Sequence, residues 1–480
     1  MKLFNTLTRE NSELSPLDGN KYRMYACGPT VYGPAHIGNF ITFTRSDVLY
    51  RTLKVAGMNP FYVRNITDVD DKTIRTSQEE GLTLKAFTEK WTDKFHKDCE
   101  LLNLLTPDVE PKATEHIQEQ LDIVQALVEK GHAYQGADGS VYYRVKSFCC
   151  YGKLSHFDPN ELKTQDTNSA GHANDADEYD RDSVADFALW KTRKPEDGEN
   201  YWNSPWGEGR PGWHLECSAM SMKYLGETFD LHAGGEDLCF PHHENEIAQS
   251  EAATGKEFCH HWMHSTHLMV EGKKMSKSLG NFFVLQDLID KGYSPMTIRM
   301  AFLNGHYRQQ LNFTFNGLDA AASALNKLAD MLLKTLPKDK NLSDYQKEPW
   351  PAENGFGLFT NAWKALNNDL NTPAALGAMF SALKKLTKQK LEGAALDTEL
   401  KALGALTYSL GLEVDVEPLR KAVEEKSTVE VPVEIAALAQ KRWEAKQNKD
   451  WGAADALRNE LLEKGWKILD SKDGFTVEPN

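Results

Sequence analysis

The stretch YRMYACGPTVYGPAHIGN, residues 22–39, decides the fold because it reads as a strand, a loop and the start of a helix. The apolar pattern up to Cys27 predicts a short strand, and the glycines and prolines after it predict a loop that ends at His36. Apolar side chains then recur at helical spacing over residues 40–55. Residues 60–65 read as a second strand, so the segment predicts a βαβ unit that opens a parallel sheet.

The remaining chain continues this α/β pattern and then becomes helical. Helical patterns over 84–105 and 115–130, followed by a hairpin-like run, predict an insertion between two halves of a nucleotide-binding fold. The segment 164–186 is polar and reads as a solvated loop. The second half is predicted to hold a helix through residues 213–217, strands at 228–232 and 266–270, and a helix starting at residue 241. A helical region from residue 293 and a small terminal unit from residue 433 follow.

Length and charge limit the possible classes of protein. A chain of 480 residues exceeds the size of a single core, so two or more domains are expected. The net charge of −15 argues against a generally basic nucleic-acid binder but leaves room for a local basic patch. No apolar run reaches the roughly 18 residues that span a bilayer, and the first residues lack the apolar core of a signal peptide. We therefore expect a cytoplasmic protein without a membrane partner.

The seven cysteines favour free thiols or metal ligands over disulfides, because their number is odd and no secretory signal precedes them. Cys149 and Cys150 are adjacent. For this pair the sequence favours small buried residues beside a strand over a redox function. A histidine-rich run with Cys259, which extends to His267, resembles a second metal site in composition, but core and helix-end hydrogen bonds are the favoured interpretation.

Two segments have the composition of phosphate-binding loops. His36-Ile37-Gly38-Asn39 stands where a helix begins, and free backbone N–H groups and a positive helix end attract anions there. Taken alone, this segment reads at least as well as an ordinary turn. The run from Lys274 to Ser278, Lys-Met-Ser-Lys-Ser, is called the lysine loop below. It places two lysines and two hydroxyls where a leaving pyrophosphate could be held. The pair of loops predicts attack of a carboxylate on the α-phosphate of ATP, with catalysis by positioning and charge stabilisation.

A possible metal site lies between these loops in the sequence. His242 and Glu246 are four residues apart on a predicted helix, as metal ligands on one helix face often are. An isolated pair of this kind is more often a polar helix surface, but candidate thiolates elsewhere in the chain favour a metal.

The motif pair, in this order and on this fold pattern, resembles the class I aminoacyl-tRNA synthetases, and the segments around it resemble the cysteinyl-tRNA synthetase family. The segments that carry the resemblance are Tyr25-Ala26-Cys27-Gly28-Pro29-Thr30-Val31-Tyr32, Arg64-Asn65-Ile66-Thr67-Asp68, Gly212-Trp213-His214-Leu215-Glu216-Cys217-Ser218-Ala219-Met220 and Phe240-Pro241-His242-His243-Glu244-Asn245-Glu246-Ile247-Ala248-Gln249. Asn39 departs from the final histidine of the family's first motif.

The resemblance implies a fold and a domain order. It implies an α/β, Rossmann-like parallel-sheet catalytic domain with an inserted connective segment, followed by a helical bundle and a small C-terminal anticodon-binding domain. The predicted boundaries are 1–110 for the first half of the catalytic domain, 111–205 for the insertion, 206–290 for the second half with the zinc site and the lysine loop, 291–425 for the helical stem-contact and bundle domain, and 426–480 for the anticodon-binding domain.

The resemblance also implies the site residues. It implies one Zn²⁺ per chain on Cys27, Cys217, His242 and Glu246, with catalytic roles for His36, Asn39, Lys274 and Lys277. ATP with Mg²⁺ is the implied nucleotide, held by His36, Gly38, Asn39, Gly235, Asp237 and Lys277. The amino-acid pocket would be lined by Thr67, Trp213 and His232. Zinc separates cysteine from serine, since a thiolate is a soft ligand and a hydroxyl is a poor one.

The C-terminal segment decides between two acceptors of the activated cysteine. Lys441, Arg442 and Lys446 form a basic stretch, and Trp451 offers a surface on which an unpaired base can stack, so these four residues are predicted to bind tRNA(Cys). A charged helix face is the alternative interpretation. A related ligase transfers cysteine to an amino sugar with the same nucleotide and zinc motifs, but such relatives lack this C-terminal end. A zinc-containing regulator without catalysis would have little reason to keep both lysines of the lysine loop. We therefore expect a monomeric ligase that uses L-cysteine, ATP and tRNA.

Overall fold

The computed structural model describes residues 1–157, 173–174, 186–275, 279–352, 355–421, 431–471 and 474–479. These residues form two compact units, one of Met1–Leu328 and Lys338–Val414 and the other of Ala329–Pro337 and Asp415–Asn480. Most of the polar segment 164–186 and the predicted catalytic residue Lys277 lie outside the described residues. The five predicted domain ranges remain predictions.

A four-stranded parallel sheet forms the centre of the first unit. Its order is β11-β10-β3-β4, and every neighbouring pair is parallel. The strands are β3 (Tyr22–Ala26), β4 (Pro60–Arg64), β10 (Phe229–Gly235) and β11 (Cys259–Ser265). Helix α1 (Ile37–Val55) joins β3 to β4, as the βαβ pattern predicted. Helices α5 (Trp213–Leu225) and α6 (Glu244–Thr254) belong to the second half of the fold.

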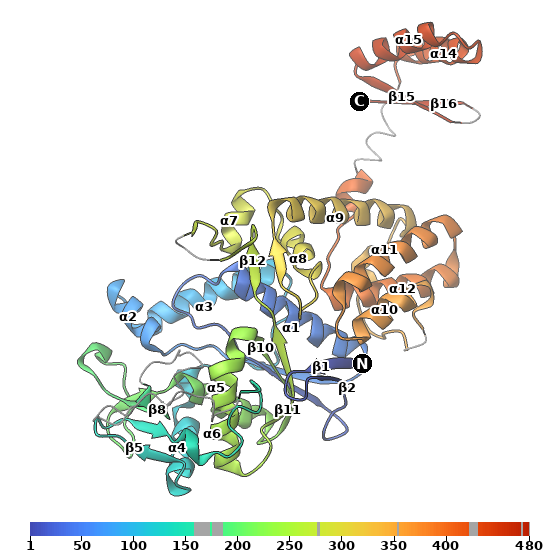
Figure 1. Ribbon diagram of the computed structural model, residues 1–480. Coiled ribbons are helices and arrows are strands. Elements are labelled where there is room, and N and C mark those ends of the chain that lie inside the picture. Colours follow the sequence, from blue (N-terminus) through green and yellow to red (C-terminus); the bar gives the residue numbers. More distant parts are fainter. Residues whose placement is uncertain are drawn as a thin grey trace. The chain divides into compact units, whose positions relative to one another are not determined.

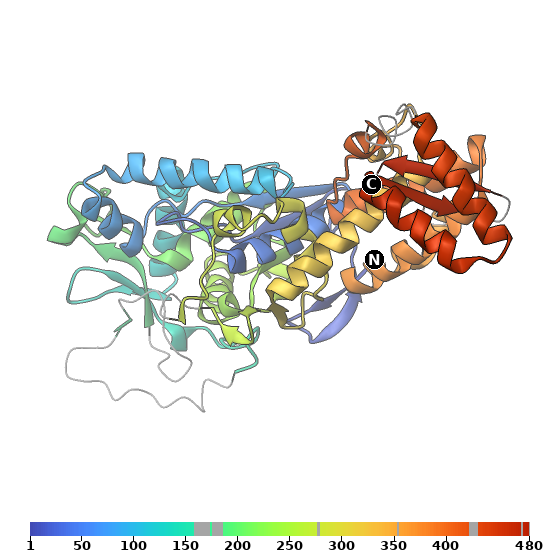
Figure 2. The ribbon, with the colours of Figure 1, turned by 90° about the horizontal axis from the view of Figure 1, so that it is seen from above.

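The insertion has a sheet of its own, with β5-β6-β8-β7 in order and β9 paired to β8. Its elements and the helices that precede it are α2 (Asp71–Glu79), α3 (Leu84–Leu101), α4 (Ile117–Glu129), β5 (Ala133–Gln135), β6 (Val141–Tyr143), β7 (Ala173–Asn174), β8 (Asp186–Thr192) and β9 (Gly209–Pro211). Within the first unit, the insertion lies at one end and the helices α10–α12 lie at the other, with the parallel sheet between them (Figures 1 and 2).

Mostly helical structure follows the sheet. The elements are β12 (Leu268–Val270), β13 (Lys273–Lys274), α7 (Leu285–Asp290), α8 (Pro295–Leu303), β14 (Leu311–Phe313), α9 (Phe315–Thr335), α10 (Thr360–Asn367), α11 (Thr372–Gln389) and α12 (Gly393–Leu410). The boundary between the two units falls within α9. Across the part of the chain that the structure describes, no helix has both the length and the apolar character needed to cross a membrane.

The second unit contains a small α/β module. Helices α14 (Val433–Gln447) and α15 (Trp451–Glu463) pack with the antiparallel pair β15 (Trp466–Asp470) and β16 (Phe475–Pro479). Its small core consists of Ile435, Ala439, Leu461 and Ile468.

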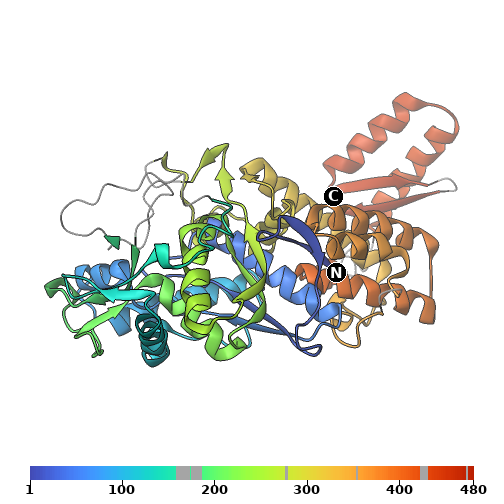
Figure 3. The same cartoon turned by 60° about the horizontal axis from the view of Figure 1, so that its bottom comes forward.

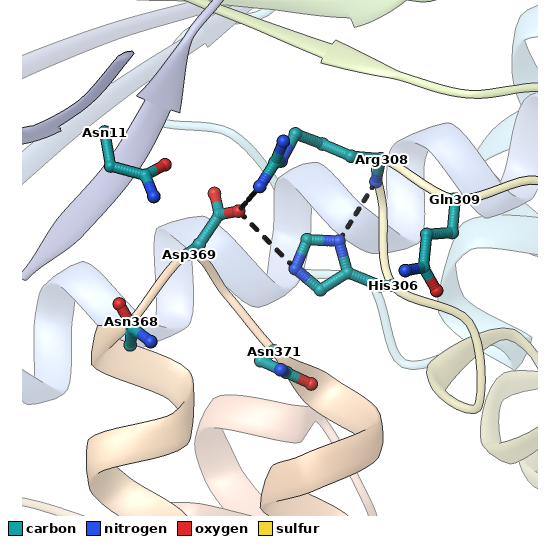
Figure 4. A pocket seen from close by; sticks show the side chains of 7 residues that line it. All are labelled: Asn11, His306, Arg308, Gln309, Asn368, Asp369 and Asn371. Carbon is teal, nitrogen blue, oxygen red and sulfur yellow. Dashed lines mark hydrogen bonds and ion pairs between the residues drawn. The ribbon is translucent and has the colours of Figure 1, made fainter.

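The N-terminal hairpin, β1 (Lys2–Asn5) and β2 (Glu10–Glu13), connects the parallel sheet to the helices (Figure 3). The Asn5 side chain donates to the His260 carbonyl in β11, while the Phe4 N–H donates to Asp369 after α10. Arg308 and His306 point toward the Asp369 carboxylate (Figure 4). These groups border a polar pocket of about 350 Å³, whose lining includes none of the predicted site residues.

Candidate active site

His36 and Asn39 together cap the first helix. The Asn39 N–H donates to Nδ1 of His36 at 3.2 Å, and the His36 N–H donates to the Asn39 side-chain oxygen at 3.1 Å. Such a reciprocal cap satisfies two N–H groups that would otherwise lack helical partners. Because Nδ1 accepts, the neutral ring carries its proton on Nε2 and can donate it to a phosphate oxygen. Burial lowers the pKa of His36, which favours this neutral form.

The two predicted phosphate loops meet in the structure. The Ile37 N–H donates to the Phe283 carbonyl at 3.0 Å, and His36 forms a backbone bridge with Val284. A Cβ on Gly38 would lie 3.0 Å from the His36 ring and 3.1 Å from Cε of Met275. Glycine therefore allows the histidine and the methionine of the lysine loop to approach each other at the start of α1.

A tight hairpin presents Lys274. Val270 pairs with Lys273 and Met269 with Lys274, leaving only two residues, Glu271 and Gly272, in the turn. Both have positive φ, 50° and 74°, as a two-residue hairpin turn of this kind requires. Lys274 is exposed at the end of the hairpin.

The end of the lysine loop is also fixed. Asn281 donates from its side chain to the carbonyls of Lys274 and Val270 at 3.2 and 3.4 Å. Residues 276–278, with Lys277, lie between these two anchored ends but outside the described chain.

Gly235 and Asp237 stand at the carboxyl end of β10, where the sheet meets this loop pair. Asp237 is exposed, and its charge raises the pKa of His36 against the larger effect of burial. A Cβ on Gly235 would lie 2.3 Å from the Asp237 carboxylate, so glycine lets the carboxylate fold back onto the backbone. The crevice beyond the carboxyl ends of parallel strands is the usual nucleotide position in such sheets.

Six buried groups form a donor cluster beside this crevice: Cys27, Cys217, His232, His242, His243 and Glu246. Cys27 follows β3, His232 lies in β10 and Cys217 lies on α5. The helix predicted to start at residue 241 begins at Glu244 as α6, after an irregular turn, Cys239–His243, in which Phe240 has the extended backbone angles −140° and 132°. His242 and Glu246 nevertheless face each other, with Nε2 and Oε1 3.1 Å apart.

The donor cluster contains two overlapping sets of four possible metal ligands. One set is Cys27, Cys217, His242 and Glu246, the set that the resemblance implies; the other is Cys27, His232, His243 and Glu246. In each set all ligand atoms lie within 4.8 Å of one another. Donors bound to one zinc ion at about 2.0–2.3 Å are separated by at most about 4.6 Å.

Separations in both sets suit one metal ion. Sγ of Cys27 lies 4.0 Å from Oε1 of Glu246, which the sets share, 4.0 Å from Sγ of Cys217 in the first set and 3.3 Å from Nε2 of His243 in the second. The first set contributes two thiols, an imidazole and a carboxylate, which are normal zinc donors. The residues present therefore fit a zinc ion.

Burial keeps the donor cluster uncharged unless a cation is bound. Burial raises the pKa of Cys27 to about 11 and that of Glu246 to about 8, and it lowers the pKa of His242 to about 4 and that of His232 to about 3. Without a cation these groups are neutral at pH 7, because burial penalises every charged form. A divalent cation reverses the preference of the thiols and the carboxyl group.

Further histidines orient the donors. Nδ1 of His242 lies 3.0 Å from Nδ1 of His214, which leaves the His242 Nε2 directed at Glu246. Nδ1 of His243 lies 2.8 Å from Nε2 of His264, and Nδ1 of His264 lies 2.8 Å from Oγ1 of Thr6. Hydrogen bonds of this kind fix the ring orientation of metal ligands.

Of the predicted amino-acid residues, His232 belongs to the donor cluster and Trp213 contacts it. Trp213 lies over His242 with ring centroids 4.2 Å apart, and His232 donates to or accepts from Glu246 at 2.9 Å. The Thr67 hydroxyl donates to the carboxylate of Glu216.

The sequence interpretation did not assign roles to Asn65, Glu216, His214 or His243. Asn65 accepts from the Gly28 N–H at 2.8 Å and donates to the Thr67 hydroxyl at 3.1 Å. All four lie within segments that carried the family resemblance, and that was the available signal. Only the tertiary contacts separate orienting residues from ligands.

The C-terminal candidates differ in exposure. Lys441 is exposed, and the Trp451 side chain is 60% exposed. Arg442 is buried and its guanidinium donates to Asp470, while Lys446 lies 2.7 Å from the same carboxylate. These bonds lower the pKa of Asp470 to about 2. Arg442 and Lys446 thus share one carboxylate, and the tRNA-binding role of the four residues stays a prediction.

Two minor predictions about cysteines have different outcomes. Within the described residues, the possible metal sets include neither Cys259 nor its neighbouring histidines, and His261 lies 3.2 Å from the Phe4 carbonyl, as the favoured core interpretation predicts. The interpretation of Cys149 and Cys150 as buried residues is wrong, since both are exposed and their sulfurs lie 3.1 Å apart. They lie in a surface turn after the insertion's second strand.

Comparisons with known proteins identify the family of the chain. The model of the class I tRNA synthetase (C) catalytic domain matches residues 13–323, and the DALR domain model matches residues 363–414. The chain is 50% identical to the cysteine–tRNA ligase of Opitutus terrae, covering 100% of this chain and 99% of that protein. It is 41% identical to the cysteine–tRNA ligase of Brachyspira hyodysenteriae, covering 98% of each.

A solved structure supports the fold. Mycobacterium tuberculosis methionyl-tRNA synthetase, in complex with methionyl-adenylate, is similar with a TM-score of 0.57 at 14% identity, covering 84% of this chain and 93% of that one. The predicted α/β fold class and the predicted ligase class are confirmed. Its catalytic-domain match and its full-length similarity to curated ligases establish that the chain belongs to the cysteine–tRNA ligase family of class I tRNA synthetases.

Proposed function

We propose that this chain activates L-cysteine with ATP to cysteinyl-adenylate and transfers the cysteinyl group to tRNA(Cys), selecting cysteine through its thiolate at a zinc ion. The observation that carries the proposal is the position of the donor cluster: Cys27 and His36 belong to the same loop between β3 and α1. Selection and activation would therefore take place on adjoining walls of one crevice. A cytoplasmic location and a monomeric state remain predictions.

The first chemical step is displacement at phosphorus. The cysteine carboxylate attacks the α-phosphorus of ATP, a P–O bond forms, and pyrophosphate leaves with Mg²⁺. His36 would donate from Nε2 to a phosphate oxygen at the start of α1, and Lys274 and Lys277 would stabilise the leaving pyrophosphate. The Asp237 carboxylate would accept from the ribose hydroxyls of ATP. A hydroxyl of the tRNA's terminal ribose then attacks the carbonyl carbon, and AMP leaves.

The specificity residues are proposed from the donor set. Cys27, Cys217, His242 and Glu246 would hold zinc, which when bound supplies a soft Lewis acid for the substrate thiolate. Trp213 and His232 would shape the surrounding pocket, since they contact the ligands His242 and Glu246. Thr67 is proposed with them because it donates to Glu216, the residue before Cys217. Lys441, Arg442, Lys446 and Trp451 are proposed as tRNA contacts.

The acceptor is tested by offering both candidates to the purified protein. Charging of total tRNA with radiolabelled cysteine, set against transfer to an amino sugar, separates the proposed function from its alternative. Acid-precipitable cysteinyl-tRNA formed only with ATP present is the expected result. Transfer to the amino sugar with no charged tRNA would contradict the proposal.

Cysteine and serine should differ in the activation step. The protein is expected to exchange labelled pyrophosphate into ATP with cysteine and not with serine. Apolar pockets separate such close analogues by only about a hundredfold, so a larger ratio points to ligation of the thiolate. Equal exchange rates with the two amino acids would exclude selection at zinc.

Replacing Lys277 with alanine should depress activation. Loss of a charge that stabilises the transition state typically costs about 10²–10³-fold in rate, so cysteine-dependent pyrophosphate exchange should fall by that factor. Zinc content should stay at one per chain. The matched control is Lys273→Ala, because Lys273 is an exposed lysine four residues earlier in the chain and outside the motif. Unchanged exchange in Lys277→Ala would remove the lysine loop from the mechanism.

A further inference from the structure

The turn that contains Cys149 and Cys150 has no role in the function proposed above. Both thiols are exposed, whereas the five other cysteines are buried. Their sulfurs are 3.1 Å apart, close enough for one thiophilic atom to bond to both, because two sulfurs held at about 2.3 Å by one ion are at most about 4.6 Å apart. The pair is thus pre-arranged on the surface as a vicinal dithiol.

The residues after the pair are fixed to helix α6. Glu244, fully buried at the start of α6, accepts from the N–H groups of Gly152, Leu154 and Ser155 at 2.8, 3.1 and 2.8 Å. The Ser155 hydroxyl adds a fourth bond at 2.9 Å. Tyr151 also donates to Asn245 at 2.5 Å. The turn therefore holds the beginning of α6 directly beside Cys150.

The turn has little freedom to adjust. Gly152 has φ of +95°, and a Cβ there would lie 2.3 Å from the Phe157 carbonyl oxygen. Lys153 is anchored too, with Nζ 2.6 Å from the Glu251 carboxylate on α6. A group bound to Cys149 and Cys150 is therefore attached directly to a turn whose next residues are hydrogen-bonded to α6. That helix also carries Glu246 of the donor cluster.

We propose that Cys149 and Cys150 form a covalent capture site for trivalent arsenicals, and that capture disturbs α6 and so slows amino-acid activation. In the reaction two As–S bonds form and the As–O bonds of the arsenical break. The two thiol protons leave with the oxygen as water. Arsenic remains trivalent, so neither an oxidant nor a reductant takes part. The effect on activation rests on the proposed function, whereas capture itself does not.

Capture is measured by mass on the full-length, zinc-loaded protein. One equivalent of phenylarsine oxide should increase the mass of each chain by the mass of the reagent minus one water. The increase should map to the peptide that contains both cysteines. The adduct should resist glutathione and be removed by the dithiol 2,3-dimercaptopropanol, because two bonds must be replaced together. Cys149→Ser and Cys150→Ser should each abolish the glutathione-resistant adduct, while Cys259→Ser, which alters a buried thiol, should retain it.

Two results would overturn capture at this site. The first is the same resistant adduct in Cys149→Ser. The second is an adduct mapped to Cys27 and Cys217, the other close pair, accompanied by loss of zinc.

The coupling to α6 has its own measurement. Cysteine-dependent pyrophosphate exchange should fall about tenfold in the captured protein, the loss typical when a group that orients a metal ligand is disturbed. The same dose should leave exchange by Cys150→Ser unchanged. Undiminished exchange by fully captured protein would refute the coupling. If the untreated protein shows no cysteine-dependent exchange, the proposed function fails, and the mass measurement still decides whether the dithiol captures the arsenical.

Discussion

Replacement of Cys217 with serine is expected to remove the zinc ion and to reduce cysteine-dependent pyrophosphate exchange by more than about a hundredfold, since loss of an outer-shell partner alone costs about 10–100-fold. Serine keeps the size of the side chain but replaces a soft thiolate with a hydroxyl, a poor zinc ligand. Cys217 is 1% exposed, and Sγ lies 4.0 Å from Sγ of Cys27. Zinc per chain, measured by atomic emission, and exchange should fall together.

The control for this change is Cys259→Ser. Cys259 is a buried thiol on β11 of the same sheet, and it donates to the His261 carbonyl outside the donor cluster. This variant should keep one zinc per chain and most of its exchange activity. Full zinc content in Cys217→Ser would show that the second donor set, with His232 and His243, holds the metal instead.

Replacement of Asp47 with alanine is expected to destabilise the first unit by about 3–5 kcal/mol, because it leaves buried guanidinium groups without their carboxylate. Oδ2 of Asp47 accepts from Arg51 at 2.8 Å and from Arg299 at 2.6 Å. The three side chains are at most 4% exposed. Arg299 lies on α8 and Asp47 on α1, so this carboxylate connects the nucleotide fold to the helices that follow it. In urea, this variant should unfold at a lower midpoint concentration than the original protein.

An exposed pair provides the comparison. Lys401 and Asp397 on α12 are 3.0 Å apart, but their side chains are 55% and 46% exposed. Asp397→Ala should therefore cost no more than about 1 kcal/mol. If Asp47→Ala lost equally little stability, the buried arginines would have found other hydrogen-bond partners.

The contribution of Asp47 to the stability of the first unit also depends on pH. Burial raises the pKa of Asp47, but the charges of Arg51 and Arg299 together outweigh burial, so the net shift is downward. Such a carboxyl group has a lower pKa in the folded state than its value of about 3.9 in the unfolded state. It therefore contributes its full stabilisation of the folded state at pH values above about 3.9. This contribution is lost as pH falls through the lowered folded pKa. The difference in stability between the original protein and Asp47→Ala should therefore narrow in acid.

The regular part of the fold follows from local patterns. The predicted strands at 22–27 and 60–65 and the helix between them correspond to β3, β4 and α1 within two or three residues, because alternation and helical spacing are properties of neighbouring residues. The irregular turn at Cys239–His243 was not predicted. Its backbone follows from contacts with distant elements, such as that between His242 and His214, and no local pattern records them.

The solvent exposure of individual side chains was the property that the sequence predicted least well. Cys149 and Cys150 were assigned to the interior and lie at the surface, while Arg442, which belongs to the stretch predicted to bind tRNA, lies buried against Asp470. In each case residue type suggested one environment and the packing of other segments decided the actual one. A cysteine prefers burial and an arginine prefers water only on average.

The amino-acid sequence by itself determined the α/β fold, the order of the two phosphate loops and, through family resemblance, the four proposed zinc ligands. Tertiary structure alone decided that His36 and Asn39 cap each other, that Gly38 lies against Met275 of the lysine loop, and that His232 and His243 form a second donor set on Glu246. The physical reason is the distance along the chain between the residues that interact. Helix and strand patterns depend on residues a few positions apart, whereas the donor cluster joins Cys27 to residues about two hundred positions away, where the parallel strands end together.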